Sequence, residues 1–396
     1  MITEHEYSNP SDETSFFHLF LEELDQWCQD ALPTHLLSSH QLGYIDRKIW
    51  LELGKLGLLG VSAPLQYGGL NLNLWYQTKI MKTLSFYNPS LGLSYIAHAN
   101  LCMSQIIRFG NLEQQSHYLP KLISGESIGA LAISESHAGS DACSMKLNAQ
   151  KSGDQYCLNG HKYWITNAPI ADVFVVYANT NPKLGKHGIS AFIVDRNTPG
   201  LSIGQPIQKI GMKQSPTAEL IFQDCWLHES QLLGDENQGV YIMMKGLDHE
   251  RLVLSGGPQG IHKRILSEII PYANERQQFG QSIGSFQLTQ QKLATHYTSY
   301  ESGHHWLEKL CQKKSVNNIE CAGVFLHCAK NAVAAALDGI QIFGGSGYTT
   351  DLPMGELLLD AKLYEIGGGT NEIRELLIGK SLLKHHHSLK HLDCLS

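Results

Sequence analysis

The hydrophobic period of the chain changes twice, and these changes limit the folds that it can adopt. In the first third, apolar residues recur every three to four positions, as at Phe16, Phe20, Leu24 and Trp27, which is typical of helices that bury one face. Further helices are expected at 49–59 and 92–109. From about residue 237 the helical period returns and continues to Leu383.

The segment between these helical parts has the pattern of strands. Its apolar runs are short, rich in β-branched and aromatic residues, and separated by turn signals at Asn159-Gly160 and Pro199-Gly200. Strands are expected at 130–133, 156–158, 162–166, 173–177, 189–194 and 219–222. We therefore expect an α+β protein with an N-terminal helical domain (1–127), a central β domain (128–236) and a C-terminal helical domain (237–396).

Composition narrows the functional classes. A chain of 396 residues with 42% hydrophobic and 17% charged residues is globular and fits two or three domains. Its formal net charge of -7 disfavours binding to nucleic acid. The nine cysteines contain no CxxC pair, which indicates reduced thiols. With no secretory signal and no long apolar run, we expect a cytoplasmic protein without membrane insertion.

One glutamate lies on an otherwise apolar helix face. Met243, Leu247, Glu250 and Leu254 follow one another at spacings of four, three and four, which places them on one face. A buried carboxylate is costly unless it is paired or has a chemical task, and burial raises its pKa toward the range of a general base. Glu250 is therefore either a catalytic base or a structural residue paired to a neighbour.

The adjacent face of the same helix is more polar. It carries Tyr241, Met244, Asp248 and Arg251 at the same spacing. This face can hold a polar ligand, or it can be solvated with an ion pair between Asp248 and Arg251.

Two segments of the β domain admit a ligand-binding interpretation. From Leu131 a strand runs into a loop of small residues that ends at Asp141, and such a loop can cradle a ring edge or a phosphate, or can be an ordinary turn. At 162–169 a strand ends in a turn, where Trp164 can stack on a ligand and Thr166 can donate a hydrogen bond. A core tryptophan explains the same pattern.

Glycine clusters and an arginine in the C-terminal part are equally open. The clusters at 344–347 and 367–370 lie in helical sequence, so neither is a Rossmann GxGxxG loop. They can admit a ligand to the backbone or form tight turns between helices. Arg276 can clamp a diphosphate or form a surface salt bridge. The tail at His385-His386-His387 can in principle bind metal, but a loose tail is the better interpretation, so no metal site is expected.

Taken together, these motifs resemble those of the acyl-CoA dehydrogenase family, and most closely those of its isovaleryl-CoA dehydrogenases. The resemblance covers roughly residues 15–384, and six motifs occur in the family's order. They are Ser134-Glu-x-x-Ala-Gly-Ser-Asp141, Trp164-Ile-Thr-Asn167, Gly246-Leu-Asp-x-Glu-Arg251, Arg276-x-x-Phe-Gly280, Gln341-Ile-Phe-Gly-Gly345 and Leu363-Tyr-Glu-Ile-Gly-x-Gly-Thr370. The resemblance implies a central domain like a β barrel and a C-terminal four-helix bundle.

The resemblance also implies FAD as the cofactor, bound across a subunit interface. At least a dimer, and commonly a tetramer, then follows. The FAD-binding residues that it implies are Leu131, Ile133, Ser134, Gly139, Ser140, Trp164, Ile165, Thr166, Arg276, Phe279, Gln287, Gln341, Gly344, Gly345, Thr370 and Glu372.

The implied reaction removes the α-proton of an acyl thioester and passes the β-hydride to flavin. Many family members carry the base at the position of Gly368, which has no side chain to act. The isovaleryl-CoA group uses the glutamate that corresponds to Glu250, while Glu365 is assigned a structural role. An amide near position 365 is expected to polarise the thioester carbonyl. The implied substrate contacts are Ser140, Tyr241, Asp248, Arg251, Gly368 and Gly369.

The substrate and the electron acceptor are less constrained. A short branched acyl-CoA with an electron-transferring flavoprotein as acceptor, in leucine catabolism, is the leading expectation. The alternative is an acyl or aminoacyl group on a carrier protein, with oxygen as a possible acceptor. A DNA-associated member and a non-catalytic FAD scaffold are less favoured. Three departures from the family pattern, Leu359, Ser136 and His249, bear on substrate and acceptor.

Overall fold

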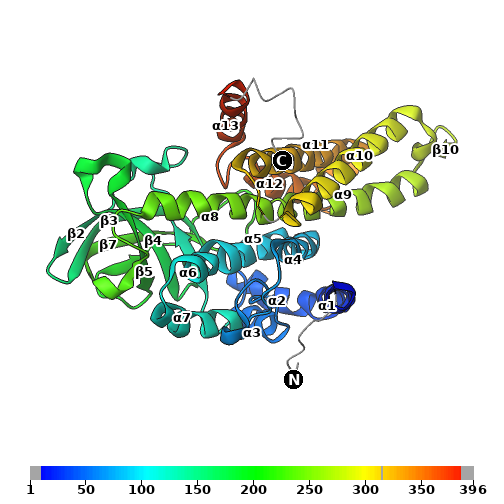
Figure 1. Cartoon of the computed structure of the whole chain (residues 1–396). Coiled ribbons are helices and arrows are strands. Elements are labelled where there is room, and N and C mark those ends of the chain that lie inside the picture. Colours follow the sequence, from blue (N-terminus) through cyan, green and yellow to red (C-terminus); the bar gives the residue numbers. More distant parts are fainter. Residues whose placement is uncertain (1–9, 314, 385–396) are drawn as a thin grey trace.

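The computed structural model describes residues 10–313 and 315–384, without the side chains of 10–16, 40–42 and 248. N-terminal helices, a central β sheet and C-terminal helices follow one another along the chain (Figure 1). This order confirms the α+β fold class. The tail at 385–387 and the side chains of Phe16 and Asp248 lie outside the described parts. We propose the domain divisions 1–127, 128–236 and 237–396, because these boundaries fall between α7 and β1 and between β8 and α8.

The N-terminal part is helical, with two differences from the expected boundaries. The first is that α3 ends at Lys55, where Leu56 and then Gly57 (φ 75°) stop the helix before residue 59. The second is that the stretch 92–109 is divided by a π-helical segment, η2. The elements are α1 (Pro10–Asp30), α2 (Leu32–Leu42), α3 (Arg47–Lys55), α4 (Leu74–Tyr87), α5 (Pro89–Ile96), η2 (Ala97–Cys102), α6 (Met103–Phe109) and α7 (Leu112–Ser124).

The central sheet has the strand order β6-β7-β3-β2-β4-β5-β8, and β1 pairs in parallel with β4. Its expected strands are present, and β2, β6 and β8 were missed because they are short or polar. The strands are β1 (Gly129–Ala132), β2 (Asn148–Ser152), β3 (Gln155–Thr166), β4 (Val173–Asn179), β5 (Ile189–Asp195), β6 (Leu201–Ile203), β7 (Thr217–His228) and β8 (Leu232–Leu233).

The turn expected at Asn159-Gly160 is wrong, because both residues lie inside the single long strand β3. Here the β3–β7 register shifts between Leu158 and Gly160. The extra residue is on β7, and the Asn159 side-chain oxygen accepts from the backbone N–H of Asp224 at 2.9 Å. Asn-Gly therefore lies opposite a β-bulge, where a local irregularity replaces the hairpin.

The C-terminal part contains α8 (Gly239–Leu254), which runs from the sheet toward the helical bundle (Figure 1). A small hairpin, β9 (Gln277–Gln278) and β10 (Gln281–Ser282), interrupts the bundle at the end farthest from the sheet. Both expected glycine clusters fall between helices. The helices are α9 (Gly256–Glu275), α10 (Gln287–Cys311), α11 (Asn318–Phe343), α12 (Met354–Tyr364) and α13 (Asn371–Lys384). None of the helices in the described ranges is long and apolar enough to cross a membrane.

A buried histidine joins the π-helical segment to the sheet. His98 Nδ1 accepts from the N–H of Gly129 at 2.9 Å, so Nε2 carries the proton that it shares with the Leu122 carbonyl at 3.0 Å. The imidazole is fully buried, and burial lowers the pKa of His98 to about 4. Only the neutral ring satisfies both partners, because a protonated Nδ1 cannot accept.

We predict that acid destabilises this junction. The folded His98 binds a proton less readily than the unfolded chain, so stability falls as pH drops below about 6.5 and levels off below about pH 4. At pH 5 the loss from this group is about 2 kcal/mol. Urea unfolding at pH 7.5 and pH 5 measures it, and a His98→Gln variant serves as control. A pH dependence as steep in the variant as in the wild type contradicts the assignment.

Candidate active site

Glu250 lies on the apolar face of α8 that the sequence predicts. Met243 and Leu254 are buried, Leu247 is half-buried, and Glu250 itself is 7% exposed. Burial raises the pKa of Glu250 to about 7, and the nearby charges of Arg251 and Arg374 oppose the rise. A carboxyl with this pKa is partly ionised at neutral pH and can accept a proton.

The glycine cluster after α12 faces this carboxylate. A Cβ at Gly368 would lie 3.7 Å from Glu250 Oε1 and only 3.0 Å from Leu254 and Phe325 side-chain carbons, and the φ of Gly368 is 65°. A Cβ at Gly369 would lie 3.9 Å from Arg251 Nη2. The fold therefore joins two motifs more than a hundred residues apart, and α8 supplies a carboxylate where position 368 has no room for a longer side chain.

Arg374 is a site residue that the sequence argument missed. It is fully buried in α13, and its guanidinium donates to the carbonyls of Tyr364 (2.8 Å) and Gly367 (2.7 Å) and to Asn371 Oδ1 (2.8 Å). It also lies 3.8 Å from the centre of the Phe325 ring. Arg374 thus holds the glycine segment in place and contributes positive charge near Glu250. Its position four residues after Thr370 is the only sequence signal for it.

The small-residue loop after β1 is attached to β3 by a buried ion pair, also missed from the sequence. Lys162 Nζ lies 2.9 Å from Glu135 Oε1 and donates to the Ile133 carbonyl at 2.8 Å. Glu135 also accepts from the N–H groups of Lys146 (2.6 Å) and Leu147 (2.9 Å). Burial raises the pKa of Glu135, but Lys162 and these amides outweigh it and hold the pKa below its usual value.

A backbone hydrogen bond to β3 also brings the loop after β1 beside Trp164. The N–H of Tyr163 donates to the Ser134 carbonyl at 2.8 Å. At a second register shift in β3, between Lys162 and Ile165, Trp164 has φ 65° and its indole is 56% exposed. This β-bulge turns the indole outward, away from the core.

These features fit a bound flavin. Ile165 differs from the expectation, because its side chain is not available to a ligand. A Cβ at Gly139 meets no atom within 4 Å, and Ser134, Ser140 and Thr166 are at least partly exposed. By contrast, the Ile165 side chain is 2% exposed and belongs to the core. Ile165 therefore has only its backbone to present to a ligand, because alternate strand residues point to opposite faces.

The second group of expected FAD residues lies at the other end of the molecule. Phe279 (φ 52°) and Gly280 (φ 78°) form the turn of the β9–β10 hairpin, and Phe279 is 94% exposed. Figure 1 shows this hairpin remote from the sheet. Arg276 and Gln341 are exposed, and a Cβ at Gly344 or Gly345 would meet open space. Gln287 begins α10 nearby, whereas Thr370 and Glu372 lie at the start of α13. One chain does not bring the two groups together.

The remaining expected substrate residues lie along α8 and the β1 loop. Tyr241 is 55% exposed, with its ring 6.1 Å from that of Phe109. Arg251 is 8% exposed, so the solvated alternative for its side chain is wrong.

The structure also locates the three residues that depart from the family pattern. His249 is half-buried, and burial with the charges of Arg108 and Lys245 lowers its pKa to about 4. Ser136 is exposed, and Leu359 is half-buried with its carbonyl close to Gly211. Glu365 accepts from Asn371 Nδ2 at 3.1 Å and pairs with Lys362, which is a structural arrangement.

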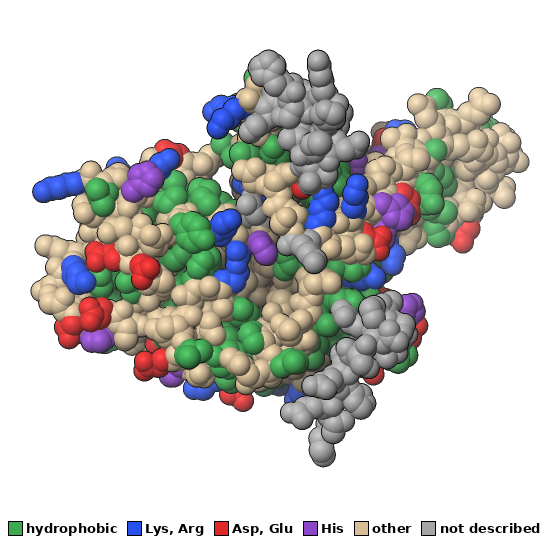
Figure 2. Space-filling view, viewed as in Figure 1, with side chains coloured by type: hydrophobic (Ala, Val, Ile, Leu, Met, Phe, Trp, Pro, Cys, Tyr) green, Lys and Arg blue, Asp and Glu red, His purple; other side chains and the backbone are tan. Residues whose placement is uncertain are grey.

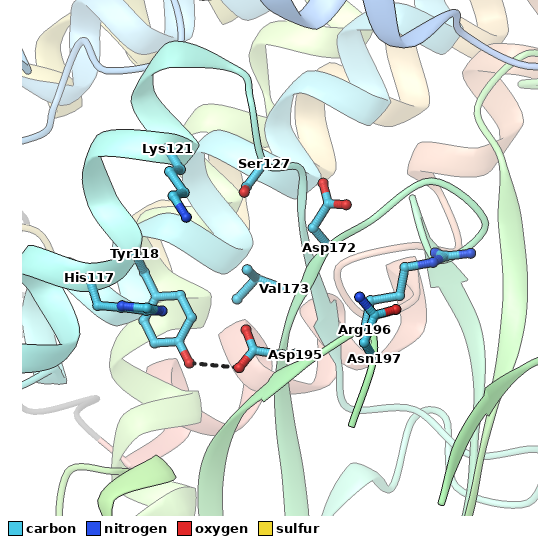
Figure 3. Close-up of a pocket in the computed structure, with 9 residues that line it drawn as sticks. All are labelled: His117, Tyr118, Lys121, Ser127, Asp172, Val173, Asp195, Arg196 and Asn197. Atoms are coloured by element: carbon cyan, nitrogen blue, oxygen red, sulfur yellow. Dashed lines mark hydrogen bonds between the residues drawn. The ribbon is translucent and has the colours of Figure 1, made fainter. Parts of the chain in front are cut away.

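A polar cavity of about 260 Å³ lies away from these residues (Figure 3). Three of its charged side chains make structural contacts: Asp172 pairs with Arg47 at 2.8 Å, Arg196 donates to the Ala171 carbonyl, and Asp195 accepts from Tyr118. It contains none of the expected site residues. In the part of the chain that the structure describes, no group of three or more His, Cys, Asp or Glu side chains is arranged for metal.

Comparison with known proteins agrees with this geometry. Models of the acyl-CoA dehydrogenase N-terminal, middle and C-terminal domains match residues 17–126, 130–225 and 237–383. The mitochondrial isovaleryl-CoA dehydrogenase of Pongo abelii is 50% identical over 346 residues, 86% of this chain and 82% of that protein. That of Solanum tuberosum is 45% identical over 370 residues, 92% and 90% of the two chains.

Among solved structures, the prolyl acyl carrier protein oxidase AnaB superposes with a TM-score of 0.89 at 32% identity, covering 93% of this chain and 99% of that chain. The chain therefore belongs to the acyl-CoA dehydrogenase family. It is an FAD-dependent oxidoreductase that acts on the CH–CH group of acyl-CoA esters.

We predict that Lys162→Met leaves Glu135 as an unpaired buried charge and lowers the free energy of unfolding by about 3–5 kcal/mol. It should also reduce the fraction of protein purified with FAD, because the loop after β1 is released from β3. Urea unfolding and the ratio of flavin to protein absorbance measure the two effects. The matched control is Lys162→Met with Glu135→Leu, which should recover much of the stability. No recovery would show that the pair is not the cause.

We also predict that Arg374→Gln shifts the acid limb of the pH–kcat profile upward, because one of the two charges that oppose the pKa rise of Glu250 is gone. The profile distinguishes this from simple loosening of the glycine segment, which lowers kcat without moving the limb. Arg374→Lys keeps the charge and should restore the limb even where kcat stays low. An unmoved limb in Arg374→Gln contradicts the electrostatic role.

Proposed function

We propose that the protein dehydrogenates a short branched-chain acyl-CoA of the isovaleryl-CoA type, with Glu250 as the catalytic base. The observation that carries the proposal is the placement of a buried carboxylate of raised pKa against the side-chain-free Gly368. Relatives that are 45–50% identical over most of the chain are named isovaleryl-CoA dehydrogenases, and one is named 2-methylacyl-CoA dehydrogenase. Both names describe branched acyl groups.

In the proposed mechanism Glu250 removes the α-proton of the thioester. Apolar surroundings keep water from the carboxylate and raise its basicity. Leu254 and Phe325, packed beside Gly368, orient the acyl group so that the α-carbon reaches Glu250. When bound, FAD would supply the redox chemistry, as the acceptor for the hydride of the β-carbon.

The thioester carbonyl requires a hydrogen-bond donor. The amides of Glu365, Ile366 and Gly367 already donate to helix carbonyls at 2.7–3.2 Å, so the expected donor near position 365 is occupied. Among the described residues, no backbone carbonyl accepts from the N–H of Gly368. We infer that the Gly368 amide polarises the carbonyl as negative charge develops on it.

The cofactor site supports an oligomer. We propose that Leu131, Ile133, Ser134, Ser140, Trp164 and Thr166 of one chain contact the flavin ring, and that Arg276, Phe279, Gln287, Gln341, Gly344 and Gly345 of a second copy hold the diphosphate and adenosine. The exposure of Phe279 and the distance of its hairpin from the sheet support this division. Thr370 and Glu372 complete the site. A homotetramer is proposed, together with an electron-transferring flavoprotein as the acceptor.

Substrate contacts are proposed for Ser140, Tyr241, Asp248, Arg251 and Gly369 along the thioester arm. A carrier-tethered acyl group with oxygen as acceptor is the second candidate, supported by the similarity to the carrier-protein oxidase AnaB. A cytoplasmic location and a role in leucine catabolism stay predictions. The isovaleryl-CoA dehydrogenases compared above carry the word mitochondrial in their names.

We predict that isovaleryl-CoA, added anaerobically to the holoenzyme, bleaches the oxidised-flavin absorbance promptly. Glu250→Gln should reduce the rate by roughly 10²–10⁴-fold with FAD still bound, because the amide cannot take the proton. In the wild type the rate should fall as pH drops below about 7, since the base must be ionised. The matched control is Glu365→Gln, which alters the neighbouring structural carboxylate.

Flavin that stays oxidised with isovaleryl-CoA but bleaches with a carrier-tethered acyl group would overturn the CoA assignment. A Glu250→Gln variant that bleaches at the wild-type rate would overturn the role of Glu250.

A further inference from the structure

Three side chains meet beside Gly368, the glycine that faces the proposed base. A Cβ at this position would lie 3.0 Å from Phe325 Cε1, 3.0 Å from Leu254 Cδ1 and 3.7 Å from Glu250 Oε1. Phe325, on α11, is fully buried, and Leu254 is 4% exposed. The apolar contacts that an acyl group meets here are therefore interior ones, and not those of the mixed hydrophobic and charged surface that Figure 2 shows.

The ring of Phe325 is held in place from more than one direction. Its face is covered by Arg374, whose guanidinium carbon lies 3.8 Å from the ring centre, and a cation stacked in this way is attracted to the ring. Tyr364 packs edge to face with the same ring, with the two ring centres 6.4 Å apart. Arg374 and Tyr364 are also joined to each other, because Arg374 donates to the Tyr364 carbonyl at 2.8 Å. Since a close-packed core resists displacement, Phe325 forms a fixed wall that does not yield to a ligand.

The space between Gly368 and this wall is already filled. Carbon atoms in contact lie about 3.5–4.0 Å apart, whereas the position of a Gly368 Cβ is only 3.0 Å from Phe325 Cε1. The function proposed above, on which this inference rests, places the thioester carbonyl at the Gly368 amide and the α-carbon at Glu250. These two substrate carbons are bonded to each other, so a branch on the α-carbon lies beside Gly368 and meets the Phe325 ring.

We propose that Phe325 is a specificity-determining residue that rejects acyl groups branched at the α-carbon. The β-carbon is one bond farther from the carbonyl, so a branch on it lies away from Gly368 and avoids the ring. The substrate class is then a short acyl-CoA branched at the β-carbon, as isovaleryl-CoA is, and not an α-branched isomer. A clash with a fixed side chain discriminates between two ligands of similar composition.

Two isomeric substrates test the proposal on the holoenzyme. Isovaleryl-CoA carries its branch at the β-carbon and 2-methylbutyryl-CoA at the α-carbon, so the two differ in shape and not in composition. With a dye as the electron acceptor, we expect the kcat/KM of the wild type to be higher for isovaleryl-CoA by roughly 10–200-fold, the range that a small change in the fit of an apolar pocket produces.

Two variants of Phe325 make the test specific. Phe325→Leu shortens the wall, so it should lower the ratio of the two kcat/KM values by roughly tenfold through a gain with 2-methylbutyryl-CoA. Phe325→Met replaces the ring with a flexible side chain that a ligand can displace, so it should move the ratio in the same direction. The flavin-to-protein absorbance ratio shows which variants retain FAD.

The ratio also separates selectivity from a general structural effect. Loosening of the bundle lowers kcat/KM for both isomers alike and leaves their ratio unchanged. The matched control is Val324→Ala, which shortens the neighbouring buried residue of α11 in a separate apolar cluster with Leu252 and Cys321, and which should leave the ratio unchanged. Binding is measured apart from turnover in the Glu250→Gln holoenzyme, where titration calorimetry should give a lower Kd for isovaleryl-CoA than for 2-methylbutyryl-CoA.

Two results overturn the proposal while the proposed function stands. One is an equal kcat/KM for the two isomers in a wild type that oxidises isovaleryl-CoA. The other is an unchanged ratio in the Phe325 variants that retain FAD. A wild type whose flavin neither isomer bleaches is a different outcome, which contradicts the proposed function and this inference with it.

Discussion

The structure depends on one helix that packs against all three parts of the chain. Helix α8 contacts α4, α6 and η2 from the N-terminal part, β5 from the sheet, and α9 and α11 from the bundle. A carboxylate on such a helix has little access to water, and Glu250 accordingly has a raised pKa. The chemistry follows from this packing, because an exposed glutamate on the same helix would be ionised and weakly basic at neutral pH.

Two buried cations, Arg251 and Arg374, limit the rise in the pKa of Glu250 to a range that suits a general base. Desolvation without compensation would leave Glu250 fully protonated, and compensation by a direct ion pair would make it a poor base. Arg251 precedes the glycine segment and Arg374 follows it, and Arg374 is tied to the backbone carbonyls of Tyr364 and Gly367. Arg374, one of the two cations that lower the pKa of the proposed base, therefore also holds the segment that faces it.

A buried ion pair, Glu135 with Lys162, holds the loop that we propose to contact the flavin. Its partners lie in β3 and in the loop after β1, and both side chains are buried. The pair fixes the loop beside the bulge that exposes Trp164. Both halves of the site thus rely on ionic groups removed from water, which are costly to bury and costly to break.

The period of the apolar residues was enough to predict the order of helices and strands, because each period reflects which side of a local element is buried. It was also enough to single out Glu250, the one carboxylate on an apolar stripe. Strand continuity was not predictable: Asn159-Gly160 has the local signature of a turn, yet pairing with β7 carries the strand through it. The strand β2 was missed because it is polar, and its strand conformation depends on pairing with β3.

What the sequence by itself determined is the set of local elements and the family motifs, since these are properties of short segments. Only the tertiary structure decided which of them meet. Gly368 and Glu250 come together through helix packing. Arg374 is held by the carbonyls of Tyr364 and Gly367, and Ile165 is turned inward by the alternation of β3.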